Sequence, residues 1–190
     1  MDASTSNELT ALDFRQRLAV PGDASVPLQR QSPFFEDITP GMALEMTKPP
    51  ITRLQIAKFA GASGDFNPSH VDEDIARDIG GMGGVFAHGM IGMGFIGQLL
   101  TDFLWDRPLR MFSTRAVLIV RPGDSLTCTA KVLRKWVEDE ENIVEFEVQA
   151  VNQRGEVTHT GRAEAVLPHR PLAIKSALKR PYLVQHRVIG

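Results

Sequence analysis

The feature of this sequence that most constrains its fold is the apolar run from Met90 to Leu104. Read as a helix, the run places large hydrophobic side chains almost all the way around its circumference: Met90, Ile91, Met93, Phe95, Ile96, Leu99, Leu100, Phe103 and Leu104. A helix that is apolar on every side is expected to be buried on every side. At 1.5 Å per residue it would be about 22 Å long, enough to lie across a sheet. The rest of the domain must therefore supply a surface that covers this helix.

After this run, the hydrophobic period changes from that of a helix to the two-residue period of a strand. Strand-like patterns occupy four runs: 114–120, 126–132, 144–150 and 157–167. Polar turns separate them at 121–124, 138–142 and 152–156. Connections this short make neighbouring strands antiparallel. The sequence therefore predicts an antiparallel meander with one dry face and one wet face.

Two helices are predicted before the apolar run. Thr52 and Gln55 form a capping box, in which each side chain satisfies a free backbone N–H, so a helix is expected over 53–62. Asp72 is a good N-cap for a second, short helix that ends at the glycine pair 80–81.

The order of these elements indicates the fold class. A short strand at 42–46 is followed by helices, by one buried helix and then by a meander of long strands. A curved antiparallel sheet wrapped around a long central helix accounts for both the apolar helix and the meander of strands. We therefore predict an α+β protein with the hot dog fold.

Composition shifts divide the chain into three parts. Residues 1–33 mix polar residues and proline and are expected to be an N-terminal extension, while 34–168 form the domain. Residues 169–190 contain five basic residues and no acidic one, so they form a basic C-terminal tail. Such a tail is expected to be solvated or to dock on an acidic neighbour, and a phosphate-contacting role is the alternative.

Charge, cysteine content and hydropathy exclude several classes of protein. The net charge of −2 gives no electrostatic reason to expect nucleic acid as a partner. The single cysteine, Cys128, excludes an internal disulfide and fits a reducing cytoplasm. No apolar run is long enough to span a bilayer, and no signal peptide is evident. We expect a cytoplasmic protein with no membrane association.

The segment from Ser63 to Asp72 contains the residues best suited to chemistry. Pro68 disfavours a helix and pushes Asn67 into an extended conformation. In a straight helix Asp65 and His70 would project about 140° apart. A bent loop can aim both side chains into one cavity, as an acid–base pair requires. Taken singly, the same residues also suit ordinary turn capping and a hydrogen-bonded loop histidine.

Three motifs together resemble one known family. The string Gly64-Asp65-x-Asn67-Pro68-x-His70-x-Asp72 resembles the hydratase-2 signature of MaoC-like dehydratases, the (R)-specific enoyl-CoA hydratase family. Ala87-His88-Gly89-Met90 resembles the second motif of that family, which opens the central helix. Arg121-Pro122-Gly123-Asp124 resembles its turn between the following strands. The resemblance covers residues 34–168, which identifies this part as a MaoC-like hot dog domain.

The resemblance implies a hydro-lyase. Such an enzyme reversibly adds water to a 2-enoyl thioester of CoA or acyl-carrier protein, giving a 3-hydroxyacyl thioester with R specificity. By resemblance, Asp65 and His70 hold the water and Asn67 orders the loop, while the backbone N–H of Gly89 binds the thioester carbonyl. Physical chemistry agrees, because a carboxylate and an imidazole can exchange protons near neutrality. A helix N-terminus also favours the developing oxyanion.

Two positions depart from the family pattern. Many relatives carry a serine about six residues after the histidine of the second motif, where this chain has Gly94. Ser69 replaces the aliphatic residue that is usual between the proline and the histidine of the first motif. If the missing serine orients the carboxylate, another group must do so here.

Several other patterns are set aside. Gly92-x-Gly94-x-x-Gly97 fits a dinucleotide fingerprint only formally, because no strand precedes it. We expect no metal, because the spacing of Asp65, His70, Asp72 and His88 matches no common metal motif. We interpret His88 as a structural hydrogen-bonding residue more readily than as a catalyst. Cys128 and His159 are interpreted as core residues.

The resemblance also bears on partners and cofactors. We expect an acyl thioester substrate, no cofactor beyond the thioester carrier, and a homodimer or higher oligomer in which two sheets continue into each other. Two alternatives stay open. The chain can be the subunit of a hetero-oligomeric dehydratase that mainly binds a catalytic partner, or it can be a hot dog acyl-CoA thioesterase.

Overall fold

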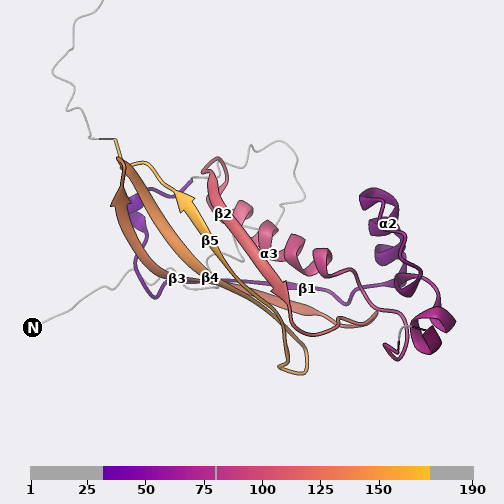
Figure 1. The fold of residues 1–190 in the computed structure, drawn as a ribbon. Coiled ribbons are helices and arrows are strands. Elements are labelled where there is room, and N and C mark those ends of the chain that lie inside the picture. The colour runs from indigo at the N-terminus through magenta and orange to yellow at the C-terminus, as the bar shows by residue number, and fades with distance from the viewer. Residues whose placement is uncertain (1–31, 80, 172–190) are drawn as a thin grey trace, which may run out of the picture.

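A computed structural model describes residues 32–79 and 81–171, and its elements follow the predicted order (Figure 1). The helical elements are η1 (Phe35–Asp37), α2 (Arg53–Ser63), η2 (Pro68–His70), η3 (Ile75–Ile79) and α3 (Gly89–Leu104). The strands are β1 (Ala43–Lys48), β2 (Leu109–Ala116), β3 (Leu126–Glu138), β4 (Glu141–Asn152) and β5 (Val157–Val166).

The five strands form one antiparallel sheet in the order β1-β3-β4-β5-β2. The sheet curves, and α3 runs along its inner side, while α2 stands beyond the N-terminal end of α3 (Figure 1). Ile96, Leu99, Leu100 and Leu104 of α3 are fully buried against strand residues such as Phe146. This arrangement confirms the hot dog fold.

Helix α3 is not buried on every side, so that expectation was wrong for the single chain. Met90 has 59% of its surface exposed, and Gly94, Gln98 and Thr101 are exposed along the same side of the helix. These positions recur at helical spacing and form a stripe. The sheet curves around most of the helix but leaves this stripe uncovered.

The strand predicted at 114–120 was placed too far along the chain. Strand β2 spans Leu109–Ala116, and its ladder with β5 ends where Ala116 pairs with His159. Residues 117–120 leave the sheet but keep backbone contacts: the N–H of Val117 donates to the Thr158 carbonyl, and Val120 accepts from Ala87. Val120 is buried whereas Val117 and Leu118 are exposed, so the strand-like composition of these residues does not make them members of the ladder.

The predicted helix starts are confirmed. The capping box at Thr52 is present, with the Gln55 N–H donating to Thr52 Oγ1 at 3.1 Å. Asp72 Oδ1 accepts from the N–H groups of Asp74 and Ile75, both at 3.0 Å. The short helix that follows is a π-helix, η3.

Cys128 lies in the core, as predicted, and is fully buried. Burial raises the pKa of its thiol to about 12. The thiol is therefore protonated and unreactive at neutral pH.

The buried carboxylate of Asp124 anchors the turn after residues 117–120. It accepts hydrogen bonds from the Arg121 N–H, the Gln153 amide and the Arg154 guanidinium at 2.7–2.9 Å. Burial acts to raise the pKa of this carboxyl, but the hydrogen bonds outweigh it and hold the pKa below its ordinary value. The Arg121 guanidinium donates to the carbonyls of Met82, Gly84 and Val85. The turn thereby joins two segments that approach the start of α3.

The proposed ends of the domain are only partly described. Residues 1–31 of the predicted extension and 172–190 of the predicted tail lie outside the described residues. At the start of the tail, Nδ1 of His169 lies within hydrogen-bonding distance of the Glu36 carboxylate, and Arg170 forms an ion pair with Asp37. Within the part of the chain that the structure describes, no helix has the length and hydrophobicity needed to cross a bilayer.

Candidate active site

The segment between α2 and η3 is bent, as its sequence predicts. Gly64 ends α2 in the left-handed region, with a φ of 75° that favours glycine. Asn67 then caps η2, because its Oδ1 accepts from the Ser69 N–H at 3.1 Å. Pro68 occupies the first turn, where its missing N–H costs nothing. Asn67 therefore orders this loop in the structure.

The bend brings together the two residues predicted to react. A carboxylate oxygen of Asp65, a ring nitrogen of His70 and a ring nitrogen of His88 lie within 4.8 Å of one another. Two hydrogen bonds of about 2.8 Å span up to roughly 5.6 Å, so one water can contact both Asp65 and His70. Asp65 is exposed and His70 is buried. The carboxylate is thus open to solvent, while protein packing fixes the imidazole.

The protonation of the neutral His70 ring follows from its hydrogen bond. Nδ1 lies 2.9 Å from the carbonyl oxygen of Phe86, which can only accept. Nδ1 therefore carries the hydrogen, and Nε2 presents a lone pair. An unprotonated Nε2 is what a general base requires.

His88 connects the loop to the start of α3. Its Nε2–H donates to the backbone carbonyl of Asp65 at 3.0 Å, and its ring stacks on that of His70 with centroids 3.8 Å apart. His88 is also the N-cap residue of α3, but its side chain makes no capping hydrogen bond. Its buried Nδ1 has no hydrogen-bond partner among the described residues. These contacts are those of a residue that fixes the loop.

The same three side chains are the group best able to hold a cation in the described ranges. His70 and His88 each have one nitrogen bonded to a backbone carbonyl, so each can offer only the other. Their rings are stacked, with an interplanar angle of 30°. The three ligand atoms are close enough to form an acid–base cluster, and the absence of a metal stays a prediction.

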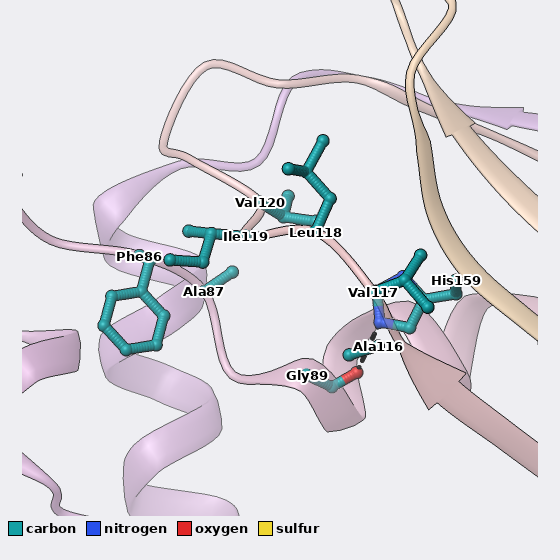
Figure 2. Close-up of a pocket in the computed structure, with 9 residues that line it drawn as sticks. All are labelled: Phe86, Ala87, Gly89, Ala116, Val117, Leu118, Ile119, Val120 and His159. Atoms are coloured by element: carbon teal, nitrogen blue, oxygen red, sulfur yellow. Dashed lines mark hydrogen bonds between the residues drawn. The ribbon is translucent and has the colours of Figure 1, made fainter. Parts of the chain in front are cut away.

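A cavity of about 220 Å³ opens beside the first turn of α3 (Figure 2). Its wall is mostly apolar and comprises Phe86, Ala87, Gly89, Ala116, Val117, Leu118, Ile119, Val120 and His159. Gly89 is the first residue of α3, so its N–H has no partner within the helix. That N–H is available to a ligand carbonyl.

The predicted residues fall into two adjoining groups. Asp65, Asn67 and His70 lie in the loop, whereas Gly89 lies at the cavity, and neither Asp65 nor His70 lines it. The groups are joined by the hydrogen bond from His70 to Phe86, a cavity residue. Sequence reasoning missed the cavity wall at 117–120, because those residues read as part of a strand.

Gly94, the position at which the family resemblance leads us to expect a serine, lies on the exposed stripe of α3. A Cβ atom at this position would meet no atom within 4 Å. We expect Gly94→Ala to raise the free energy of unfolding by about 0.5–1 kcal/mol, because glycine is unfavourable inside a helix. Thermal unfolding measures this, with Gly97→Ala as the contrasting variant, since its Cβ would crowd Phe112 at 3.3 Å. Equal changes in both variants would contradict the open space at Gly94.

The hot dog fold and the closeness of Asp65 and His70 define a hot dog protein with a candidate acid–base site. Comparison with known families shows to which family it belongs. The family model for the MaoC like domain matches residues 36–154. This match covers more than half of the chain, which therefore belongs to the MaoC-like domain family.

Individual relatives agree with this assignment. An (R)-specific enoyl-CoA hydratase of Rhodospirillum rubrum is 33% identical over 144 residues, covering 72% of this chain and 93% of that protein. Among solved structures, a MaoC-like dehydratase from Rhodospirillum rubrum has a TM-score of 0.64 and 27% identity, covering 74% of this chain and all of that one. An (R)-hydratase from A. caviae involved in PHA biosynthesis has a TM-score of 0.62 and 25% identity, covering 70% and 99%.

Proposed function

We propose that this protein is a hydro-lyase that reversibly hydrates a 2-enoyl thioester to an R-3-hydroxyacyl thioester. The observation that carries the proposal is the Asp65–His70 pair placed next to the uncapped first turn of α3. The similarity to an (R)-specific enoyl-CoA hydratase supports the same reaction.

The contacts of His70 suggest how the proton moves. Its Nε2 takes a proton from the water, and the water oxygen bonds to C3 of the enoyl group while the C2–C3 π electrons shift toward the thioester oxygen. The Gly89 N–H stabilises the negative charge on that oxygen, a contribution of about 3 kcal/mol for one such donor. The His70 imidazolium then returns the proton to C2. Asp65 orients the water.

The cavity suggests where the acyl group binds. Its apolar wall favours a hydrocarbon chain, and its volume of about 220 Å³ lies below the range usual for drug-sized ligands. We expect it to hold the acyl group alone, with the CoA or acyl-carrier-protein portion outside. The reaction requires no cofactor beyond that carrier and no metal. The buried thiol of Cys128 suits a reducing compartment such as the cytoplasm.

The test is an assay of the purified full-length chain with 2-enoyl-CoA esters of graded length. We expect loss of the enoyl thioester absorbance and formation of the R-3-hydroxyacyl product. Release of free thiol without hydration would favour the thioesterase alternative. If no ester is hydrated by the chain alone or with a hot dog partner protein, the proposal is wrong.

Among the described residues, strand β2 lies at one edge of the sheet and pairs only with β5. An open edge is a template for pairing with another chain. Exposed Val117 and Leu118 follow it directly. We therefore expect a homodimer in which two β2 edges meet. Sedimentation equilibrium measures the mass, and a monomer at micromolar concentration would contradict the homodimer and leave the hetero-oligomer as the alternative.

A further inference from the structure

His159 lies beneath the first turn of α3 and touches it from the sheet side. It belongs to β5 and is 1% exposed. Its Nε2 lies 3.0 Å from the carbonyl oxygen of Gly89, a contact drawn in Figure 2. Its ring also fills the space next to Gly92. A Cβ atom at position 92 would lie 2.2 Å from the imidazole, which is a steric clash. The absence of a side chain at 92 thus makes room for this ring.

The hydrogen bonds of His159 define its protonation. The Gly89 carbonyl can only accept, so Nε2 carries a hydrogen. Nδ1 lies 3.0 Å from the hydroxyl of Thr158, which in turn lies 3.1 Å from the Ala150 carbonyl. The Thr158 hydroxyl donates its one hydrogen to the Ala150 carbonyl, so it does not donate to Nδ1. Burial lowers the pKa of the His159 imidazole, and the contact with the Gly89 carbonyl places a hydrogen on Nε2. The ring is therefore a fixed donor aimed at Gly89.

The carbonyl that receives this hydrogen bond also takes part in the α-helix, of which Gly89 is the first residue. Gly89 has no side chain, and the N-cap residue His88 makes no side-chain hydrogen bond to the first turn. The N–H and the carbonyl of Gly89 belong to neighbouring peptide planes that meet at its Cα. A donor that holds the carbonyl keeps the Gly89–Met90 plane in its helical orientation, and the backbone dihedrals of Gly89 then set the direction of the N–H.

We propose that His159 is a positioning residue, which holds the first turn of α3 through the Gly89 carbonyl so that the Gly89 N–H points at the thioester oxygen. This inference rests on the proposed hydratase function. It differs from the simple core role predicted for His159, because a core residue needs only volume, whereas positioning needs a donor at Nε2.

A matched pair of substitutions separates the two roles. Gln and Met have similar shape, but only the amide of Gln can donate to the Gly89 carbonyl. We expect His159→Met to lower kcat for enoyl-CoA hydration at least tenfold with little change in KM, and His159→Gln to retain most of the wild-type kcat. Thermal unfolding of both variants tests for equal loss of stability. The expected difference lies in kcat and not in the unfolding midpoint.

A second substitution leaves the imidazole intact but moves it. Gly92→Ala should displace the ring and lower kcat as His159→Met does. Nitrogen NMR of the wild-type imidazole should show the tautomer with hydrogen on Nε2. An active wild type with equal kcat in the Gln and Met variants would overturn the positioning role alone. A wild type that hydrates no enoyl thioester would overturn the hydratase function and the positioning role with it.

Discussion

Replacing His70 by alanine is expected to lower kcat for enoyl-CoA hydration by about 10²- to 10⁴-fold, the range that one general acid–base group contributes. The reason is the ring geometry: Nδ1 is bonded to the Phe86 carbonyl, which leaves Nε2 as the base. Asp65→Asn should cause a loss of similar order, because the amide keeps the shape of the side chain but not its charge. Stopped-flow or steady-state measurement of enoyl absorbance gives both values.

The control for this result is His169→Ala. His169 is an exposed histidine that contacts Glu36 and lies outside the loop and the cavity. Its substitution should leave kcat within about twofold, as expected when neither substrate nor catalytic group is touched. Because His70 is buried, circular dichroism and the unfolding midpoint must show that its variants stay folded. Folded His70 and Asp65 variants with wild-type kcat would contradict the acid–base assignment.

The second large effect concerns stability. Phe146→Ala is expected to lower the free energy of unfolding by about 3–5 kcal/mol, because this ring is fully buried between the sheet and α3. The midpoint of thermal unfolding should fall by about 6–20 °C. Val137→Ala is the control, since Val137 is 59% exposed near the end of β3 and should change stability by less than about 0.5 kcal/mol. Similar losses in both variants would show that the core is not where the structure places it.

Local signals in the sequence were enough to predict most of the fold. The capping box at Thr52, the apolar run after Met90 and the alternation in β3 and β4 are each encoded by residues that are neighbours in the chain. The end of β2 is not encoded locally. It depends on the pairing with β5, which ends where Ala116 pairs with His159. The open side of α3 likewise depends on how far the sheet curves, which no local pattern specifies.

The candidate site shows the same division. The closeness of Asp65 and His70 follows from a bend that Pro68 and Asn67 enforce, and the sequence predicts it. The bond between His159 and Gly89 joins residues 70 positions apart. No local pattern near either residue predicts this contact. It depends on how β5 packs against the first turn of α3 in the folded protein.

Residues 117–120 lie outside the β2–β5 ladder, and this has a consequence for how relatives of this protein can diverge. These residues form a wall of the cavity but contribute no rungs to the sheet. Under the proposed function, the loop of Asp65 and His70 determines the reaction, and this wall determines which acyl group is accepted. Substitutions in the wall can then change substrate preference without disturbing the ladder or the proton transfer. Selection can therefore diversify the substrate range while the chemistry stays constant.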